Sequence, residues 1–360
     1  MAVNLYAASY SGTLTSFELT KDRNGSYAFL QKQILNLGRR TPAWLTLDSS
    51  NGILYVANEG LTSRNGSLLS YKTSKEGNLT QIQELQTFWG PVDITLGNSV
   101  QTFSITEPGQ FVVLESYTYT MDGPGPVPNR QEAPHPHQSI LDPTGSFLLM
   151  PDLGADLVRV YKIDKTTNKL TAVEPLKATP GSGPRHGTFS KKPVGGHYIF
   201  YLVTELTSQV TAYKVTHSDC GNLSFEEVGS LSTLKPGQPI PPTTTGEGTG
   251  VGAEVAVTHD NKHVIVSNRR DLTFNNASDS MTVYEISPRT GNLTFQQQFP
   301  AGGSFPRQFA LNKAGDLVAV GLQNSGLVAV LSRNRRTGLF DRQVASVPVA
   351  GQVTCVVWDE

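Results

Sequence analysis

The sequence predicts an all-β fold, a seven-bladed β-propeller, from three observations. First, short runs of Val, Ile, Leu, Phe and Tyr bounded by Gly, Asn, Asp and Pro recur along the chain, and no window carries a sustained helical stripe. Second, 34 Gly and 22 Pro with only 16% charged residues favour many tight turns over long helices. Third, a similar unit recurs roughly every 40–50 residues, a period typical of propeller blades.

Each repeat contains a turn followed by an outer strand, and the turn usually reads Gly-Asn-Leu followed by Thr or Ser. Upstream lies a strand that ends in Tyr, as in Thr211–Tyr213, and before it a strand that begins with Pro, as at Pro184. The blades therefore open near seven positions, which are Thr41, Gly90, His135, Gly183, Gly252, Phe305 and Gly351.

The two ends of the chain complement each other. The last opening supplies a single strand, Gln352–Trp358, whereas the N-terminus starts with three strands between Val3 and Leu35 and has no opening strand before them. Pairing the C-terminal strand as the innermost strand of the N-terminal blade would remove free sheet edges. The sequence thus predicts one domain, residues 1–360, closed by this strand.

Two regions depart from the repeat. The outer strand of the second blade, Gly90–Arg130, is weak, and we expect it to give way to an irregular loop at Met121–Asn129. Between the fourth and fifth blades lies a long insertion, Leu234–Val251, and long loops in compact domains are usually functional or disordered. Its glycine run follows no strand and opens no helix, which argues against a dinucleotide-binding loop.

Charge and composition argue against several partners. The net charge is −1 and no block of Lys and Arg is present, so neither nucleic acid nor an anionic membrane is expected to bind. The apolar runs are far shorter than the roughly 20 residues of a membrane span. Two cysteines, Cys220 and Cys355, do not make a disulfide framework. The start of the sequence shows no secretion signal, so we expect a cytoplasmic protein. The sequence does not determine the oligomeric state, and a monomer is the expectation.

Six glycosylation sequons support an alternative location, a secreted form whose signal peptide has been removed. Three of them coincide with the recurring turn and therefore also have a structural explanation. The six lie at Asn24, Asn65, Asn78, Asn222, Asn276 and Asn292.

Several short motifs give the chain a resemblance to a known family. It resembles, from Asn4 to Trp358, the seven-bladed propeller lactonases, which include the bacterial-type 6-phosphogluconolactonase and the fungal carboxy-cis,cis-muconate cyclase. The two activities share these motifs, so the resemblance implies the family and not one substrate. The motifs are His135-Pro136-His137 with Asp142-Pro143, Pro151–Gly154, Gly183–His186, Thr204–Leu206, Ala253-Glu254, Ser267–Arg269 and Pro306–Phe309.

The resemblance implies four active-site residues. A His that opens the third blade, an Arg that opens the fourth, a Glu after its second strand and an Arg in the fifth blade match His137, Arg185, Glu205 and Arg269. The second blade departs from the family pattern, because Asp93 stands where a His is usual and Ile105–Glu107 replaces the usual Asn-Tyr. In the sixth blade, Gln308 follows Arg307 where the family often has Asp or Gly.

The residue types at the blade openings indicate an anionic substrate. Inner strands of a propeller line its central channel, so the opening residues should converge at the channel mouth. Arginine and histidine outnumber acids there, and such a local field suits a carboxylate, a phosphate or a developing oxyanion. Beyond the four residues above, the predicted substrate-binding groups are His135, His186, Glu254, Arg307, Gln308 and Asp93.

Structural explanations compete with these assignments. Arg185 and Glu205 could form an ion pair between neighbouring strands, and His135 and His186 could be wall residues. Glu205 could have a low pKa beside arginine or a raised one through desolvation, which the sequence does not decide. A His-x-His pair could ligate zinc, but no clear third ligand is present, so no metal and no cofactor is predicted. No Gly-x-Ser-x-Gly elbow supports covalent catalysis.

Two classes of function follow from the sequence. The first is a metal-independent enzyme acting on lactones, in which His137 or Glu205 moves a proton while Arg185 and Arg269 stabilise negative charge. The reaction would be hydrolysis of a sugar lactone or a related anionic lactone, or, as the alternative, a muconate-type cycloisomerisation. The second class is a non-catalytic binding or surface propeller that keeps the scaffold.

Overall fold

The computed structural model describes residues 2–62, 65–87, 95, 96, 98–218, 221–241, 251–271, 273, 274 and 278–360. These residues form β-strands joined by turns and loops and contain no helix, so none of them belongs to a helix that could span a membrane. The prediction of an all-β fold is therefore confirmed. The chain forms two compact units: Met1–Tyr117 with Phe274–Asp279 and Pro300–Glu360, and Thr118–Thr273 with Ser280–Phe299.

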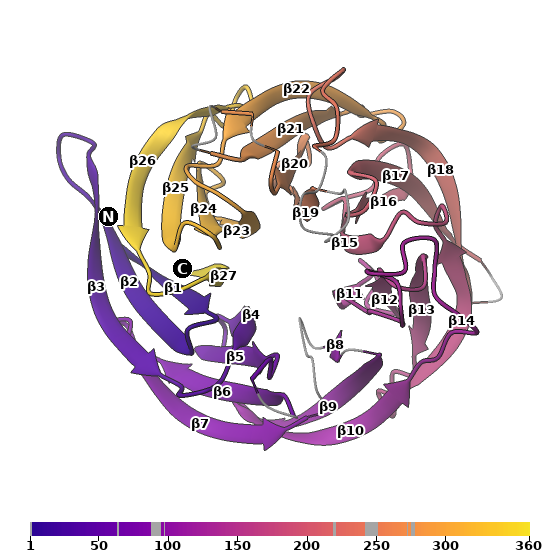
Figure 1. Ribbon diagram of the computed structural model, residues 1–360, viewed down its shortest axis with the longest axis horizontal. Coiled ribbons are helices and arrows are strands. Elements are labelled where there is room, and N and C mark those ends of the chain that lie inside the picture. The colour runs from indigo at the N-terminus through magenta and orange to yellow at the C-terminus, as the bar shows by residue number, and fades with distance from the viewer. Residues whose placement is uncertain are drawn as a thin grey trace. The chain divides into compact units, whose positions relative to one another are not determined.

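The first unit contains three four-stranded sheets and one three-stranded sheet among its described residues. The N-terminal sheet has the order β27-β1-β2-β3, the next two run β4 to β7 and β10-β9-β8, and the last runs β23 to β26 (Figure 1). Their bounds are β1 Ala2–Ser9, β2 Thr13–Lys21, β3 Tyr27–Asn36, β4 Pro42–Asp48, β5 Ile53–Asn58, β6 Ser67–Thr73, β7 Leu79–Gln86, β8 Thr95–Leu96, β9 Ser99–Glu107, β10 Gln110–Thr118, β23 Pro306–Leu311, β24 Leu317–Leu322, β25 Leu327–Arg333, β26 Phe340–Pro348 and β27 Val353–Asp359.

The second unit contains three four-stranded sheets in its described part, and in each the strands follow one another in chain order (Figure 1). Their bounds are β11 Ile140–Leu141, β12 Phe147–Asp152, β13 Leu157–Ile163, β14 Leu170–Lys177, β15 Pro184–Phe189, β16 Tyr198–Thr204, β17 Gln209–His217, β18 Leu223–Ser232, β19 Gly252–Val257, β20 His263–Asn268, β21 Ser280–Ile286 and β22 Leu293–Pro300.

Burial explains the sequence pattern of the strands. The second strand of a sheet, such as β20 or β24, is buried at every position, and the middle of each strand is an apolar run such as Val264–Val266. Outer strands such as β18 expose many of their side chains. In the second unit, Tyr201 and Val203 of β16 share one apolar core with Val264 and Val266 of β20. Stacked sheets thus bury the hydrophobic residues that the repeats supply.

Backbone geometry explains the recurring Gly-Asn-Leu turn. The glycine before the outer strand has a positive φ at Gly77 (83°), Gly221 (74°) and Gly291 (75°). In the copy that lacks this glycine, Asn168 takes the same place with φ at 57°, and asparagine tolerates that conformation better than most residues. The motif is therefore a turn requirement, which accounts for the three sequons that coincide with it.

The predicted closure is confirmed. Strand β27 pairs antiparallel with β1, with Leu5 opposite Trp358, and so completes the N-terminal sheet (Figure 1). The Trp358 indole donates a 2.9 Å hydrogen bond to the Ala310 carbonyl on β23, and Thr354 donates one of 2.8 Å to the Pro42 carbonyl on β4. One strand thus ties three sheets of the first unit together. The prediction of a single domain stays a prediction.

The expectation of a weak outer strand in the second blade is wrong. Strand β10 is nine residues long, and the Gln83 amide exchanges hydrogen bonds with the backbone of Phe111 at 2.7 and 2.9 Å. Gln33 holds Leu79, at the start of β7, in the same way. β10 is therefore the outer strand of its sheet, and the irregular segment begins only after Thr118. The interpretation failed because β10 shows four apolar residues in a row, Phe111–Leu114, rather than alternation.

We predict that Trp358→Ala lowers the free energy of unfolding by about 3–5 kcal/mol, the usual effect of truncating a large buried aromatic residue. Trp358 is 8% exposed and bonded to β23, so its loss should weaken the closure of the N-terminal sheet. The measurement is denaturant unfolding at equilibrium. Leu30→Ala on β3 of the same sheet is the control, because Leu30 is 55% exposed and should change stability by less than about 0.5 kcal/mol. Equal effects of the two substitutions would contradict this role of β27.

Candidate active site

The second unit holds a buried carboxylate surrounded by three arginines. Glu205 follows β16 directly, and its carboxylate lies 2.9 Å from Nε of Arg185, 2.6 Å from Nη2 of Arg269 and 2.6 Å from Nη2 of Arg130. Arg185 lies on β15 and Arg269 directly after β20, whereas Arg130 belongs to the segment between β10 and β11. Arg185 and Glu205 are 1% and 2% exposed. We call these four residues the arginine cluster.

A β-bulge positions the central arginine. In the pairing of β15 with β16, Pro184 faces Thr204 and His186 faces Val203, so Arg185 has no residue opposite it. Such a bulge re-aims the side chain of the extra residue, and bulges are frequent beside active sites. The Arg185 guanidinium also donates a 2.8 Å hydrogen bond to the Ala253 carbonyl, which lies in a similar bulge of β19. The guanidinium is therefore fixed from two sides.

The charges of the arginine cluster keep the Glu205 carboxyl group ionised. Burial alone would raise the pKa of Glu205, but the charges of Arg269, Arg130 and Arg185 outweigh this effect and hold its pKa well below the ordinary glutamate range. Three guanidinium charges against one carboxylate leave an excess of two positive charges. Glu205 is therefore suited to orient the arginines, and its very low basicity argues against a role in accepting a proton.

A second line of contacts runs beside the arginine cluster. Nδ1 of His186 lies 2.9 Å from Oε1 of Glu254, and Nε2 of His186 lies 3.0 Å from Nδ1 of His137. His186 follows Arg185 on β15, and Glu254 follows Ala253 on β19, so the two lines of contacts are one residue apart. We call His137, His186 and Glu254 the histidine line.

His135 lies near these groups but has a different environment. Its backbone N–H donates a 2.7 Å hydrogen bond to Oδ1 of Asp152, and its ring lies 2.9 Å from the exposed carboxylate of Glu132. Asp152 also accepts from the backbone of Ala155 and pairs with Arg159. This supports the alternative that His135 is a wall residue, although its role as a substrate-binding group stays a prediction.

Besides His135, three of the predicted binding residues are not part of these two groups. Asp93 lies outside the described residues, as do Cys220 and the glycine run of the insertion. Arg307 lies on β23 in the first unit, 5.4 Å from the ring of Tyr10, whose hydroxyl donates to Glu59. Gln308 is buried; its amide donates to the Phe309 carbonyl and accepts from the Val356 N–H of β27, so its contacts are structural.

Sequence reasoning missed Arg130. It lies in the irregular segment between β10 and β11, where no repeat predicts its position. The next residue, Gln131, is fully buried and donates a 2.9 Å hydrogen bond to the Leu153 carbonyl, which pins the segment beside the cluster. The available signal was a lone arginine at the end of a Pro- and Gly-rich stretch.

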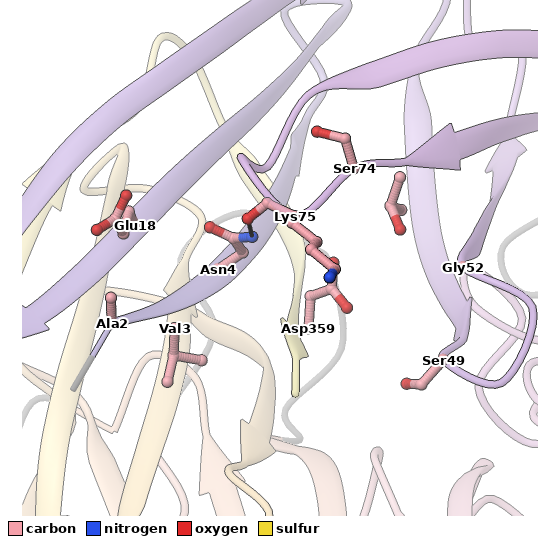
Figure 2. A pocket seen from close by; sticks show the side chains of 10 residues that line it. Ala2, Val3, Asn4, Glu18, Ser49, Gly52, Ser74, Lys75 and Asp359 are labelled. Atoms are coloured by element: carbon pink, nitrogen blue, oxygen red, sulfur yellow. Dashed lines mark hydrogen bonds between the residues drawn. The ribbon is translucent and has the colours of Figure 1, made fainter.

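Figure 2 shows a pocket of the first unit, a hollow of about 480 Å³ in which Asn4, Lys75 and Asp359 lie together. Asn4 donates a 3.1 Å hydrogen bond to the Lys75 carbonyl, and Asp359 accepts one of 2.7 Å from Tyr6. Its lining contains no histidine and none of the candidate residues. The chemistry therefore points to the second unit rather than to this hollow.

The two histidines that suggested a zinc site have different neighbours. In the described part of the chain, no three His, Cys, Asp or Glu side chains gather in a way that could hold one. The His135-x-His137 pair that suggested zinc is divided between two environments, because His135 contacts Glu132 and His137 contacts His186.

Comparison with known proteins decides the family. The model of a family described as "Lactonase, 7-bladed beta-propeller" matches residues 2–358. The chain belongs to this family. The propeller lactonases thus supply the blade count, and the resemblance stated from the motifs is confirmed.

Individual relatives support the assignment to the propeller lactonases. A "Probable 6-phosphogluconolactonase" of Arthroderma benhamiae is 32% identical over 339 residues, covering 90% of this chain and 81% of that protein. The 6-phosphogluconolactonase of Bacillus subtilis is 27% identical and covers 96% and 95%. The solved structure of a periplasmic gluconolactonase of Pseudomonas aeruginosa has a TM-score of 0.82 at 24% identity, with 99% of both chains covered, and shows the same fold. The cytoplasmic location and the secreted alternative both stay predictions.

We predict that Glu205→Gln destabilises the protein by about 3–5 kcal/mol at pH 7, because three arginines lose their carboxylate. The pKa of Glu205 is lowered in the fold, so its stabilisation is present above the unfolded pKa of about 4.3 and is lost as the pH falls below it. The difference between wild type and variant should therefore narrow by about 1.4 kcal/mol per pH unit below that value. Denaturant unfolding between pH 7 and pH 3 measures it.

The control for this prediction is Glu226→Gln. Glu226 pairs with Lys214 on the surface, and its side chain is 66% exposed. Its loss should leave the free energy of unfolding nearly unchanged, because an exposed ion pair is screened by solvent and salt. A Glu205→Gln difference that is equally small, or that does not change with pH, would contradict the description of the arginine cluster.

Proposed function

We propose that the protein is a lactone hydrolase that opens a sugar lactone or a related anionic lactone, as its relatives named 6-phosphogluconolactonase do. The observation that carries the proposal is that two groups of side chains with different chemistry lie next to each other. The arginine cluster supplies fixed positive charge, and the histidine line, one residue away on both β15 and β19, supplies a group that can move a proton near neutral pH.

The reaction needs both groups. A water oxygen attacks the lactone carbonyl while His137 takes the proton, and the carbonyl oxygen becomes an oxyanion that Arg185 and Arg269 stabilise. The ring C–O bond then breaks, and the protonated His137 gives its proton to the leaving alkoxide, which yields the hydroxy acid. The arginines supply the positive charge for this step, so the proposed reaction is metal-independent.

The sequence left open whether Glu205 or His137 moves the proton. The geometry favours His137 for this role. Glu205 has its carboxylate within 3 Å of three guanidinium groups, whereas His137 is half-buried and touches another imidazole. The excess of two positive charges suits a phosphorylated sugar lactone. It also suits a dicarboxylate, so muconate-type cycloisomerisation stays the second candidate, and the substrate panel below distinguishes the two.

The experiment is a pH-stat assay with phosphorylated aldonolactones, unphosphorylated aldonolactones and muconolactones, each corrected for spontaneous hydrolysis. We expect the phosphorylated sugar lactones to be hydrolysed with the highest kcat/KM. Formation or opening of muconolactones alone would favour the cycloisomerase. No turnover of any lactone would overturn the proposal in favour of a binding propeller.

We predict that Arg185→Ala lowers kcat by about 10²–10³, the usual effect of losing one oxyanion donor. Arg185→Lys should also be slow, because an ammonium group does not reproduce the planar fork of a guanidinium. Glu205 keeps Arg130 and Arg269 in both variants, so we expect them to fold. Arg40→Ala is the control, since Arg40 pairs with Glu84 in the first unit and touches neither group. Wild-type kcat in both Arg185 variants would contradict the role of Arg185.

A further inference from the structure

The histidine line connects three sheets of the second unit through buried side chains. His137 lies just before β11, His186 on β15 and Glu254 on β19. His186 is 1% exposed and Glu254 is 4% exposed, and the two imidazole rings meet edge to face with centroids 4.9 Å apart. The chain backbone holds the far end in place, because the His137 N–H donates a 2.8 Å hydrogen bond to the Pro151 carbonyl.

The hydrogen bonds along the histidine line determine which imidazole nitrogens carry a proton. Oε1 of Glu254 accepts a 2.9 Å hydrogen bond from the backbone N–H of Val255, so this oxygen is an acceptor. Nδ1 of His186 must then carry a proton to donate to the same oxygen. In a neutral imidazole the other nitrogen is an acceptor, so Nε2 of His186 accepts from Nδ1–H of His137. His137 is therefore held as the Nδ1–H tautomer, with the lone pair on Nε2.

The surroundings of Glu254 favour positive charge on the line. Within the described residues, its second oxygen, Oε2, is buried and has no hydrogen-bond partner. A buried carboxylate with one unsatisfied oxygen is poorly compensated, and a cation at the other end of a short hydrogen-bonded chain offsets this. The neighbouring charged groups are those of the arginine cluster, which lies next to the line through Arg185 on β15. Those arginines oppose a second cation nearby, so Glu254 supplies the local counter-charge.

We propose that Glu254 and His186 are positioning residues that set the tautomer of His137 and stabilise its charge as it takes the proton from water. The inference rests on the proposed function, because it gives His137 the role of general base. The proton leaves water and binds Nε2 of His137, whose Nδ1–H continues to donate to His186. No proton needs to pass beyond His137, and Glu254 compensates the new positive charge from two links away.

The first test reads the tautomer of His137 in the wild-type protein and uses a variant only to assign the signals. The seven histidines of the chain can be labelled with ¹⁵N, and ¹⁵N–¹H correlation through the ring distinguishes the two neutral tautomers. The His137 signals are identified by their loss in His137→Gln. We expect His137 to be the Nδ1–H tautomer above the pH at which it titrates. Finding the Nε2–H tautomer would overturn the proposal, whatever the activity of the enzyme.

The second test is Glu254→Gln, which keeps an acceptor for Val255 and removes the charge. We expect kcat to fall by about 10²-fold, the lower end of what general-base catalysis contributes, with KM unchanged. The limb of the pH profile that reports His137 should move to lower pH, because an anion that favours the imidazolium is gone. An unchanged limb and an unchanged kcat would overturn the proposal.

His217→Gln is the matched control. His217 also contacts a buried carboxylate in the second unit, Asp142 at 3.0 Å, but lies outside the two groups. It should leave kcat and the tautomer of His137 as they are in the wild type. The two proposals fail separately: absence of lactone hydrolysis by the wild type rejects the proposed function, and the wrong tautomer in an active enzyme rejects only the positioning role.

Discussion

The arrangement of the site depends on one ion cluster, the Glu205 carboxylate with Arg130, Arg185 and Arg269. Removing two or three guanidinium groups from water without a counter-charge would cost several kcal/mol per ion, so the carboxylate makes their shared burial tolerable. These four side chains come from β15, the ends of β16 and β20, and an irregular segment. Glu205 therefore does more than neutralise charge. It gathers arginines from distant parts of the chain and leaves them with an excess of positive charge.

The strand geometry explains why the proton-moving groups lie beside this charge. Bulges at the starts of β15 and β19 displace Arg185 and the Ala253-Glu254 pair from regular pairing. Consecutive residues then enter different contacts: Arg185 reaches Glu205, and His186 reaches His137 and Glu254. Consecutive residues of β15 thus supply a positive charge, through Arg185, and a contact to the basic group His137, through His186. Because both groups are anchored to backbone that is paired in sheets, they can be held in place before a substrate arrives.

Much of the fold could be predicted from the sequence because propeller repeats are local. The turn before each outer strand needs a residue with positive φ, and a strand missing at one end of the chain is matched by one left over at the other. The approach of Arg185 to Glu205 was also within reach, since both flank adjacent strands. Arg130 was not, because it lies where no periodicity exists. The contact of His186 with Glu254 joins residues 68 positions apart, and whether burial or arginine decides the pKa of Glu205 depends on distances.

The most direct test of the proposed division between charge stabilisation and proton transfer compares binding and turnover in His137→Gln. Because the arginines supply the charge and His137 moves the proton, this variant should bind the hydroxy acid product as tightly as the wild type. Titration calorimetry at low salt measures this binding. Its kcat on the corresponding lactone should fall by about 10²–10⁴, and the limb of the pH profile that reports the base should disappear. A variant that turns over the lactone at the wild-type rate with the wild-type pH profile would contradict the account.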